Sequence, residues 1–400
     1  MTSPAAANLA LLCLGTLAEQ LAVPGSPLQR QMLAGLEQDS GLHPASLLRL
    51  TQLFAKGYSS RHLAMAQRRA GAVGPWQPLG TVAVVAPGNL PVAAWQAAIE
   101  PLLAGNAVRV RPSRGHQRAL INLQGALAAI EPRVARQLSV LEFDRDDRRG
   151  WQMLLNQARC LAIHGSDAAV QAVLGHAAAA GWAGRLRVQG EMRSLAVIDA
   201  AHWQRGGQRL LDQLADDALL ADGRGCMSLR TVVAVGLAPD HAMELHRQLH
   251  EALGRAAVRW PAGPADATAG LQRQLSAQAL EMQELLADGA LTLSQRADGW
   301  LATAAHPSWL GDSWPGPGGR DLVLWTAPDW PQVQLRLQPW RGRISTLAAA
   351  ADSEQVQRLQ QELAIPRLCR PGQMQAPSAD RSADGHAPLE GMVRYLDRLR

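Results

Sequence analysis

The sequence lacks any long uninterrupted hydrophobic run, and no stretch reaches the ~18 consecutive apolar residues typical of a membrane-spanning helix. The apolar N-terminal stretch from Ala5 to Leu14 follows no basic residue, whereas a secretory signal peptide begins with a basic region. We therefore expect residues 5–23 to form a helix of the mature protein, with no membrane span and a cytoplasmic location.

Cysteine is scarce and scattered. The four cysteines stand singly, with no CxxC motif and no closely spaced histidine pair: Cys13, Cys160, Cys226 and Cys369. This pattern argues against a disulfide framework and against a zinc site, so we expect no bound metal. A cysteine with a function is then expected to be a reactive thiol rather than a ligand.

Several common functional motifs are also missing, because the sequence has no GxGxxG, Walker, HExxH or GxSxG pattern. The net charge is +5, but the basic residues are dispersed and include only one lysine, Lys56. Nucleic-acid binding requires a basic patch, so we expect no nucleic-acid partner. What is present is 400 residues of globular composition, 47% hydrophobic and 18% charged, enough for two or three domains.

Short β-branched runs alternate with helical patterns from residue 80 onward. The first example is a strand at 81–86, a turn at Pro87-Gly88-Asn89, and a helix that leads to a strand at 106–110. Such βαβ units contain parallel strands and right-handed crossovers, which predicts an α/β fold with an open, doubly wound sheet. Further strands are expected at 138–143, 159–163, 185–189, 195–199, 230–236 and 321–326, and helices at 114–131, 148–158, 166–180, 207–221, 239–253, 268–286 and 352–364.

These patterns divide the chain into four parts. Residues 1–75 have a helical pattern, 76–200 and 201–350 form two α/β regions, and 351–400 form a C-terminal return segment. Within the second region, residues 306–319 include Trp309 and Trp314 among several prolines and glycines. That segment is too long and irregular for a simple turn, so we expect a functional or flexible loop.

Cys226 lies in Asp222-Gly-Arg-Gly-Cys226-Met-Ser228, between a predicted helix and a predicted strand. The flanking glycines permit a tight turn that leaves the thiol open to a ligand. Positive charge on Arg224 and Arg230 would favour the thiolate. The alternative, which we favour for the other three cysteines, is a small buried hydrophobic side chain.

Asn89 ends the turn that follows the first strand. Its side-chain amide is suited to donate a hydrogen bond to an oxyanion at the carboxyl edge of the sheet. However, Pro-Gly-Asn is ordinary turn sequence and asparagine also caps helices. The spacing alone therefore favours the structural role.

Two further segments suit a phosphate or a dinucleotide. Arg109 and Arg111 share one face at the end of the second strand, just before Ser113, where two guanidinium groups could grip a phosphate such as the 2′-phosphate of a dinucleotide ribose. His164-Gly165-Ser166 closes a later strand and opens a helix, whose first N–H groups suit a phosphate or a nicotinamide. A solvated sheet edge and simple helix capping are the alternatives.

Taken in order, these segments resemble the aldehyde dehydrogenase superfamily, and most closely its LuxC-type branch of acyl-CoA reductases. Three motifs carry the resemblance. The family's oxyanion-asparagine turn is similar to Ala-Pro-Gly-Asn89-Leu-Pro, and its cofactor segment is similar to Gly-Asn-Ala-Val-Arg109-Val-Arg111-Pro-Ser113. Its nucleophile loop is similar to Gly223-Arg-Gly-Cys226-Met-Ser228. Two further signatures of the branch are similar to His164-Gly165-Ser166-Asp167 and to Arg370-Pro-Gly-Gln-Met-Gln375, the latter followed by Asp384-Gly385. The resemblance covers residues 75–400.

The resemblance implies an aldehyde dehydrogenase-like fold, with a nicotinamide dinucleotide-binding domain at 76–200 and a catalytic thiol domain at 201–350. The implied reaction is reduction of an acyl thioester, carried on coenzyme A or a carrier protein, to an aldehyde through a cysteine acyl-enzyme. A homodimer is implied, and an acyl-activating partner subunit is compatible with it. The implied roles are nucleophile for Cys226, oxyanion donor for Asn89, and NADPH binding for Arg109, Arg111, Ser113, His164, Gly165 and Ser166.

Three departures from the family pattern bear on the reaction. Arg111 stands where the family has lysine, which keeps a cation and suits a 2′-phosphate. The glutamate that activates water in oxidising members should fall at Gln189, which cannot act as a base, although a register shift of two positions would place Glu191 there. The tryptophan of the family's C-terminal segment is absent from residues 378–383.

Two other functions stay open on the sequence. An oxidising or acylating aldehyde dehydrogenase would need a base, so the role of Glu191 discriminates it from a reductase. A non-catalytic member that binds acyl chains or a partner would tolerate loss of Cys226, and twelve tryptophans against two phenylalanines and two tyrosines would suit its contact surface. The acyl pocket is expected in the second α/β region and the loop at 309–314.

Overall fold

The computed structural model describes residues 4–264, 291–304 and 319–396, together with residues 271, 274, 275, 278, 281 and 282. Most of the predicted helix at 268–286 and almost all of the tryptophan-containing loop at 306–319 lie outside the described residues. The chain forms two compact units. The first contains Met1–Gly41, Leu47–Glu191 and Ala376–Arg400, and the second contains Leu42–Ser46 and Met192–Gln375.

Four helices open the chain, as the helical pattern predicts. They are α1 (Pro4–Ala22), α2 (Pro27–Ser40), α3 (Pro44–Gly57) and α4 (Ser60–Val73). Helix α2 is delimited by its caps: Ser26 Oγ accepts the N–H of Gln29 at 3.1 Å, and Gly41 ends the helix at φ 61°. Because α1 and α2 contact α5 and α6, the segment predicted as a separate part at 1–75 packs largely into the first unit.

Helix α1 is the one helix of the described chain that is long and apolar enough to cross a membrane by length and composition. Half of its most apolar window is nevertheless buried inside the protein, including Ala10, Leu14, Leu17 and Leu21. A buried core helix shows the same length and composition. Helix α1 is therefore only weak support for a membrane span.

The first unit is built on a five-stranded parallel sheet in the order β4-β3-β2-β5-β6. From β2 the chain runs outward through β3 to β4, then returns to the other side of β2 as β5 and continues to β6. This arrangement confirms the predicted doubly wound sheet. The strands are β2 (Thr81–Val85), β3 (Ala107–Arg111), β4 (Leu138–Val140), β5 (Ala158–His164) and β6 (Arg185–Gln189), connected by α5 (Pro91–Leu103), α6 (Gln117–Ile130), α7 (Pro132–Ala135), α8 (Arg148–Leu155) and α9 (Asp167–Ala179).

The direction of winding reverses between β2 and β5, where Val85 is in register with Ile163. In open α/β sheets, ligands bind outside the carboxyl ends of the strands at such a reversal. The turn with Asn89 follows β2, and Gly165-Ser166 follows β5. The fold thus places two of the predicted site segments at the reversal point.

The C-terminal stretch of the chain completes the first unit. Strand β14 (Val393–Tyr395) pairs antiparallel with β1 (Trp76–Pro78). The guanidinium of Arg187 forms an ion pair with Glu100 at 2.7 Å and donates to the carbonyl of Glu390 at 3.0 Å, across 203 positions of sequence. Residues 390–395 are therefore part of the packing around β1 and β6.

The second unit is built on a seven-stranded sheet in the order β13-β12-β7-β8-β11-β10-β9. All neighbouring strands are parallel except β9, which is antiparallel to β10. The strands are β7 (Arg193–Asp199), β8 (Thr231–Val235), β9 (Leu291–Arg296), β10 (Gly299–Ala304), β11 (Leu322–Ala327), β12 (Ile344–Ala350) and β13 (Arg367–Cys369), and the helices include α10 (Ala200–Leu219), α11 (Pro239–Arg259), α13 (Trp330–Leu337) and α14 (Ser353–Glu362).

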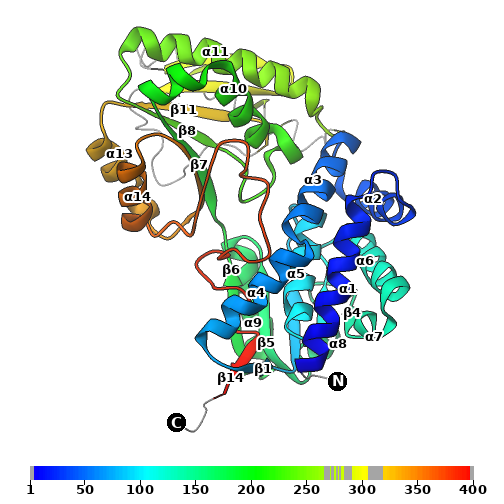
Figure 1. The fold of residues 1–400 in the computed structure, drawn as a ribbon. Coiled ribbons are helices and arrows are strands. Elements are labelled where there is room, and N and C mark those ends of the chain that lie inside the picture. Colours follow the sequence, from blue (N-terminus) through cyan, green and yellow to red (C-terminus); the bar gives the residue numbers. More distant parts are fainter. Residues whose placement is uncertain are drawn as a thin grey trace. The chain divides into compact units, whose positions relative to one another are not determined.

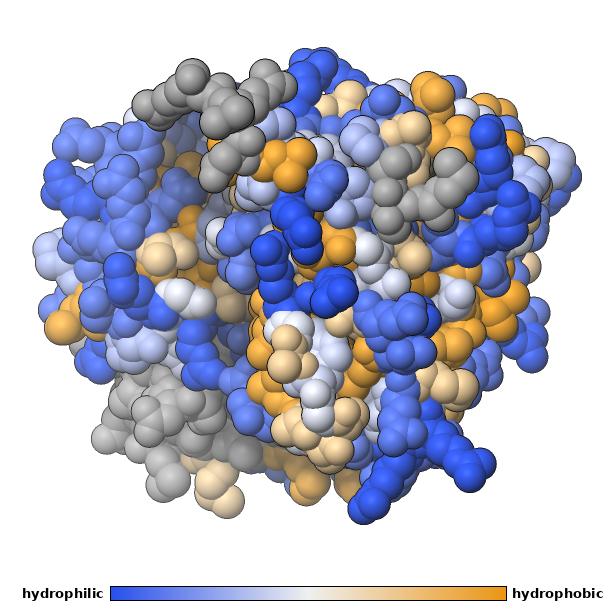
Figure 2. Space-filling view, turned by 90° about the horizontal axis from the view of Figure 1, so that it is seen from below, coloured by the Kyte–Doolittle hydropathy of each residue, from blue (hydrophilic) through white to orange (hydrophobic). Residues whose placement is uncertain are grey.

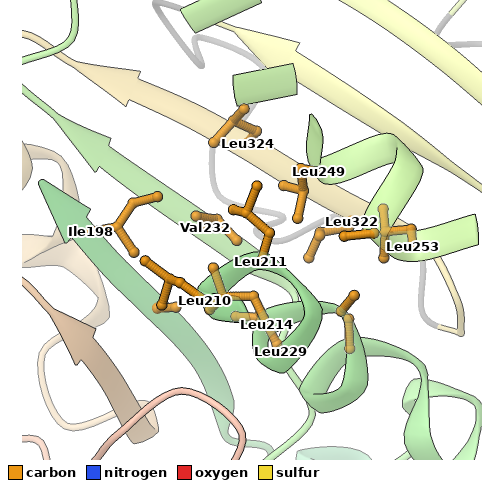
Figure 3. Close-up of a cluster of buried hydrophobic side chains, with 14 of the residues drawn as sticks. Ile198, Leu210, Leu211, Leu214, Leu229, Val232, Leu249, Leu253, Leu322 and Leu324 are labelled. Atoms are coloured by element: carbon orange, nitrogen blue, oxygen red, sulfur yellow. The ribbon is translucent and has the colours of Figure 1, made fainter. Parts of the chain in front are cut away.

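Helices α10 and α11 lie side by side and cover one face of this sheet (Figure 1). Their leucines interlock with side chains of β7, β8 and β11, and Leu229 points into the same cluster from the residues before β8 (Figure 3). Alternate residues of β7, such as Leu195 and Val197, face the other side, where α13 and α14 complete a second cluster. Both faces are therefore covered, as is usual for a parallel sheet.

Two predicted boundaries differ from the observed ones. The first α/β region was expected to reach residue 200, but the main stretch of the first unit ends at Glu191. The reason is that β7 hydrogen-bonds to β8 and β12 and so belongs to the seven-stranded sheet. The return segment expected at 351–400 also divides, because residues up to Gln375 belong to the second unit and those from Ala376 to the first.

Hydrophilic and hydrophobic residues are interspersed on the face drawn in Figure 2. Among the described residues, four of the most exposed large apolar side chains lie on four different helices: Leu12, Val73, Val258 and Leu335. Single exposed apolar residues are normal on protein surfaces. None of these four marks a site by itself.

Candidate active site

The backbone that leads to Cys226 has an uncommon conformation. Ala221, Asp222 and Gly223 all have positive φ angles, of 61°, 53° and 60°. A Cβ on Gly223 would lie 2.0 Å from the carbonyl oxygen of Gly319, so this position requires glycine. The two other residues cost about 1–2 kcal/mol each in this conformation, and the ion pair of Asp222 with buried Arg320 at 3.0 Å helps to hold them.

The turn with Cys226 closes between Gly225 and Ser228. The N–H of Ser228 donates to the carbonyl of Gly225 at 3.0 Å, and the N–H of Gly225 donates to Ser228 Oγ at 3.1 Å. Cys226 occupies the second position of this turn, and its side chain is exposed. The two hydrogen bonds fix the backbone on both sides of the thiol.

The other three cysteines differ from Cys226 in their surroundings. Cys13 and Cys160 are buried, as the sequence predicts, and Cys369 is partly buried. Burial raises the pKa of Cys13 and of Cys160 to about 11, and that of Cys369 to about 12. These thiols stay protonated at neutral pH, which leaves Cys226 as the accessible thiol of the chain.

Residues on either side of the turn anchor it in the second unit. Leu229, the residue after Ser228, is buried in the leucine cluster between α10 and the sheet (Figure 3). Ser194 is fully buried in β7, and its Oγ donates to the carbonyl of Cys226 at 2.7 Å. The peptide of the nucleophile candidate is thus tied directly to a central strand.

The segment 370–375 also contacts this turn. The Asp217 carboxylate accepts the backbone N–H groups of Gly372 at 2.6 Å and Met374 at 3.0 Å, while Gln375 Nε2 donates to Ser228 Oγ at 2.8 Å. Burial raises the pKa of Asp217 to about 7, against the opposing effect of the two N–H groups. The motif that the sequence places near the C-terminus is therefore packed beside the thiol turn.

The cations expected to favour the thiolate have other partners. Arg224 Nη2 lies 3.7 Å from the Asp222 carboxylate. Arg230 Nη1 donates to the carbonyl of Gly319 at 3.3 Å, and burial, together with the nearby charge of Arg193, lowers the pKa of Arg230 to about 10. Arg224 is therefore paired with a carboxylate and Arg230 with a backbone carbonyl.

In the first unit, the Asn89 turn is held by nearby residues. Asn89 is exposed, and its Oδ1 accepts the N–H of Leu90 at 3.0 Å. The helix that follows is capped at Leu90 without a side-chain hydrogen bond, so Asn89 is not its cap. Ser113 Oγ donates to the carbonyl of Ala86 at 3.0 Å and lies so close to Gly88 that a Cβ there would meet it at 2.8 Å.

Arg109 lies on β3 and reaches the end of helix α8. Its Nη1 donates to the carbonyl of Met153 at 3.0 Å and to that of Asn156. These are carbonyls at the C-terminal end of the helix, where a cation is favourable. This placement gives Arg109 a structural role that the sequence did not predict.

Arg111 lies at the carboxyl end of β3, on the same face as Arg109, as predicted. Its guanidinium stacks over Phe143 at 5.0 Å and Trp151 at 5.3 Å from the ring centroids, and Nη2 donates to the carbonyl of Phe143 at 3.3 Å. Burial lowers its pKa, as do the nearby charges of Arg145 and Arg114. Its buried Nε has no hydrogen-bond partner.

The end of β5 and the helix that follows combine a partly buried histidine with a helix cap. Ser166 Oγ accepts the N–H of Ala169 at 3.3 Å, so the capping role is observed. Burial lowers the pKa of His164 to about 4, with a further contribution from Arg187, against the hydrogen bond with Gln189. His164 is therefore neutral at physiological pH.

Gln189 and Glu191 occupy different surroundings. Gln189 ends β6 and is paired in register with His164. Glu191 lies beyond the strand and is exposed, and its backbone N–H donates to the Asp167 carboxylate at 3.1 Å. The residue at the position expected for the family glutamate is thus an uncharged amide that contacts a neutral imidazole. No group of three or more potential metal ligands occurs among the described residues.

A family model decides what kind of protein carries these turns. The model of the acyl-CoA reductase (LuxC) family matches residues 62–395. The chain belongs to the acyl-CoA reductase (LuxC) family. The resemblance found in the motifs is confirmed, and the protein is an oxidoreductase that acts on acyl or aldehyde substrates.

Solved structures of aldehyde dehydrogenases share the fold of this LuxC-family chain. Succinic semialdehyde dehydrogenase from Streptococcus pyogenes, in complex with NADP+, is 11% identical with a TM-score of 0.69, covering 96% of this chain and 89% of that one. A NAD-dependent benzaldehyde dehydrogenase from Corynebacterium glutamicum is 13% identical with a TM-score of 0.67, covering 92% and 80%. These likenesses confirm the predicted aldehyde dehydrogenase-like fold. No curated protein matches the sequence.

The sequence did not identify three polar residues around the Cys226 turn of this LuxC-family protein. Ser194 lies just before the strand expected at 195–199, and Asp217 lies in an ordinary helical pattern. Gln375 ends the C-terminal signature that carries part of the resemblance, which was the one signal that could have found it. Nothing in the signature itself points to the side chain that Gln375 contacts.

Proposed function

We propose that this protein uses NADPH to reduce an acyl thioester to an aldehyde through an acyl-enzyme on Cys226. The observation that carries the proposal is the exposed thiol of Cys226 on a turn fixed by buried hydrogen bonds. The other three cysteines are buried or partly buried. A thiol held toward solvent on a rigid turn is suited to attack a carbonyl carbon.

The first half of the reaction forms the acyl-enzyme. The Cys226 thiolate attacks the carbonyl carbon of the thioester, and the electron pair of the C=O bond moves to oxygen. In this proposal, Asn89 Nδ2 and the backbone N–H of Cys226 donate hydrogen bonds to that oxyanion, as the superfamily resemblance implies. Because Asn89 Oδ1 accepts from Leu90, the amide nitrogen is the end suited to donate. Collapse re-forms the C=O bond and expels the carrier as a thiolate.

The second half releases the aldehyde. A bound nicotinamide would supply a hydride to the carbonyl carbon of the acyl-enzyme. The resulting thiohemiacetal oxyanion re-forms its C=O bond, the carbon–sulfur bond breaks, and Cys226 is again a thiolate. The same oxyanion donors serve in both halves.

The residues at the carboxyl end of β3 fit the 2′-phosphate of NADPH. Burial lowers the pKa of Arg111, and the nearby charges of Arg145 and Arg114 lower it further, against the opposing charge of Asp144. Its buried Nε lacks a partner. A phosphate dianion would relieve the repulsion and could accept from such donors. In the proposal Arg111 binds this phosphate, with Arg109 on the same face of β3, Ser113 just beyond the strand, and His164-Gly165-Ser166 beside the reversal point.

The environment of Gln189 supports the reductive direction. Oxidation of an aldehyde to an acid needs a base that activates water to cleave the thioester, whereas reduction needs no water. Gln189 is not a base, and its neighbour His164 is only weakly basic at a pKa of about 4. Glu191, the alternative base, is exposed beyond the strand.

The acyl donor, the assembly and the location are part of the same proposal. The family implies an acyl thioester substrate, for which we propose an acyl-CoA or an acyl-carrier protein. A homodimer is proposed by analogy with related enzymes, and an acyl-activating partner subunit would supply the thioester. A cytoplasmic location fits a reactive thiol that takes part in no disulfide, because that compartment keeps thiols reduced.

The test is NADPH oxidation with a panel of acyl-CoA chain lengths, measured for the wild type, Cys226→Ala and, as a matched control, Cys369→Ala. We expect oxidation that requires the thioester, is lost by at least ~10³-fold in Cys226→Ala and persists in the control. Activity that survives in Cys226→Ala would overturn the covalent mechanism. A wild type that neither binds NADPH nor consumes it with any acyl-CoA would instead support a non-catalytic, acyl- or partner-binding role.

A further inference from the structure

We propose that Gln375 is a positioning residue for Cys226, because its side-chain amide fixes Ser228 and thereby the turn that carries the thiol. The inference rests on the proposed role of Cys226 as the nucleophile. It assigns a function to the C-terminal segment 370–375 that goes beyond the reaction itself. All residues concerned lie in the second unit.

Gln375 contacts the Cys226 turn directly. Gln375 is 6% exposed and Ser228 is fully buried, and Gln375 Nε2 lies 2.8 Å from Ser228 Oγ. The same amide lies 3.4 Å from the backbone carbonyl of Asp217. A buried amide that lost these partners would carry a desolvation cost of about 1–3 kcal/mol, so the contact is strongly preferred.

Ser228 acts as a hydrogen-bond acceptor in this turn. Its Oγ receives the N–H of Gly225 from one side and the Gln375 amide from the other. A hydroxyl oxygen has two lone pairs, and both are used here. The position of Oγ, and with it the closure of the turn over Cys226, is therefore set by Gln375 as well as by the turn itself.

The segment from which Gln375 extends is held on two sides. The Asp217 carboxylate binds the N–H groups of Gly372 and Met374. From the other side, the guanidinium of Arg367 donates to the carbonyl of Gln373 at 2.6 Å and to that of Met374 at 2.7 Å. The backbone just before Gln375 is thus held between a buried carboxylate and a guanidinium, so Gln375 acts from a fixed point.

The consequence concerns alignment rather than substrate affinity. Without the Gln375 amide, Ser228 Oγ can rotate away from Gly225, and the turn loses one of its two closing hydrogen bonds. The thiol then samples orientations that do not face the carbonyl carbon. We expect kcat to fall while KM changes little, because attack is sensitive to displacements of about 1 Å.

The experiment uses the full chain with four variants: Gln375→Ala, Ser228→Ala, the double variant, and Gln373→Ala as the matched control. Gln373 has the same side chain two residues away, but it is exposed, and its contact with Arg367 uses only the backbone. Steady-state kinetics with NADPH and an acyl-CoA give kcat and KM. Hydrogen–deuterium exchange of the peptide that covers residues 224–229 reports the turn directly, without any need for turnover.

We expect Gln375→Ala to lower kcat ~10–100-fold, with KM within about twofold of the wild type, and to accelerate exchange in that peptide. Gln373→Ala should match the wild type in both measurements. The double variant should be no worse than Ser228→Ala, because both changes remove the same interaction. Should Gln375→Ala fail to fold by circular dichroism, Ser228→Ala must alone show the kcat loss at unchanged KM.

The proposal is overturned if Gln375→Ala keeps wild-type exchange in residues 224–229, or if its effect multiplies with that of Ser228→Ala. The exchange result distinguishes a failure of the proposed reaction from a failure of the proposed positioning role of Gln375. If the wild type shows no acyl-CoA-dependent NADPH oxidation, the proposed reaction fails, yet exchange still shows whether Gln375 holds the turn. If activity is present and exchange is unchanged, the reaction stands and the positioning role is lost.

Discussion

Two short turns carry the candidate residues, and the protein holds them in opposite ways. The Asn89 turn of the first unit depends on residues close in sequence: Leu90 is adjacent, and Ser113 bonds a carbonyl only 27 positions away. The Cys226 turn of the second unit depends on distant residues, since its serine contacts Gln375 across 147 positions. The turn of the proposed oxyanion donor is thus held by residues nearby in the sequence, whereas the turn of the proposed nucleophile is also held by a residue far along the chain.

The difference extends to the edge of the sheet on which each turn lies. The Asn89 turn follows β2 at the carboxyl ends of parallel strands, where ligands usually bind in open α/β sheets. The Cys226 turn precedes β8 and lies at the amino ends. Parallel sheets do not usually bind ligands at the amino ends of their strands. A site at this edge must therefore be formed by additional segments of the chain.

After that of Cys226→Ala, the largest expected effect is that of a change at Asn89. Asn89→Ala should lower kcat for thioester reduction by ~10²–10³-fold, because a donor to the developing oxyanion is lost. Thermal stability should stay close to that of the wild type, since the side chain is exposed and its turn is held locally. Steady-state kinetics and thermal unfolding measure both quantities, with the exposed Asn8→Ala as the control. A stability loss without a kcat loss would show that Asn89 is only a turn residue.

The next effect tests the buried anchor of the other turn. Burial raises the pKa of Asp217 to about 7 from an unfolded value near 4. The folded state therefore binds this proton more tightly than the unfolded state, and its contribution to stability is present below pH 4 and is lost as pH rises toward 7. The loss should be roughly 2–4 kcal/mol.

Urea unfolding of the wild type and of Asp217→Asn between pH 4 and 8 measures this contribution. The variant should be less stable overall at low pH, since asparagine cannot accept from both N–H groups. Its free energy of unfolding should nevertheless decline less with rising pH than that of the wild type. A difference between the two proteins that does not change with pH would show that Asp217 is ionised throughout, and that its two backbone donors outweigh burial.

A smaller effect is expected at the carboxyl end of β3, where we propose that the cofactor binds. Arg111→Gln should raise KM for NADPH by ~10-fold and leave KM for NADH nearly unchanged, because a single guanidinium contact to phosphate is lost. Arg149→Gln, an exposed arginine on α8, serves as the charge-matched control. Equal changes in KM for the two cofactors would contradict recognition of the 2′-phosphate by Arg111.

The smallest effect is expected at Ser113, which holds the Asn89 turn as Ser228 holds the Cys226 turn. Ser113→Ala should cost about 1 kcal/mol of stability, the usual value for one hydrogen bond, because the adjacent backbone bond from Ala86 to Arg111 remains. Hydrogen exchange in residues 86–90 should change little. If Ser113→Ala opens its turn as much as Ser228→Ala opens the other, the contrast between local and distant support is wrong.

Much of the fold could be predicted because the pattern is local. The strand at 81–86 follows from a β-branched run and the helix at 166–180 from the turn residues before it, and both are found close to those positions. Strand β12 (Ile344–Ala350) was not predicted, because its alanine-rich sequence has no strong β signal and its position depends on pairing with β7. The boundary at residue 191 was missed for the same reason, since β7 is assigned to a sheet only by its partners.

The same limit applies to the candidate site. Cys226 and Asn89 could be found because glycine and proline mark their turns in the sequence. The residues that hold the two turns differ in the same way. Ser113, which holds the Asn89 turn, was named from the sequence. The residues around the Cys226 turn were not given roles: Ser194, Asp217 and Gln375. These three act across 32, 157 and 147 positions, and no local pattern encodes which distant backbone a buried polar group will meet.

The division of the first unit into separate stretches also sets an order of events during synthesis. Strands β2 to β6 have all been synthesised once residue 189 is made, but β1 still lacks its partner β14, and the carbonyl of Glu390 that receives the Arg187 guanidinium does not yet exist. The whole second unit must be translated first. Domains generally fold as they emerge. Until residues 390–395 are made, the nascent first unit therefore lacks the pairing of β1 with β14 and the hydrogen bond from Arg187 to the carbonyl of Glu390. Truncation or a bulky fusion near residue 390 would prolong that state, and low yield of folded protein is its expected consequence.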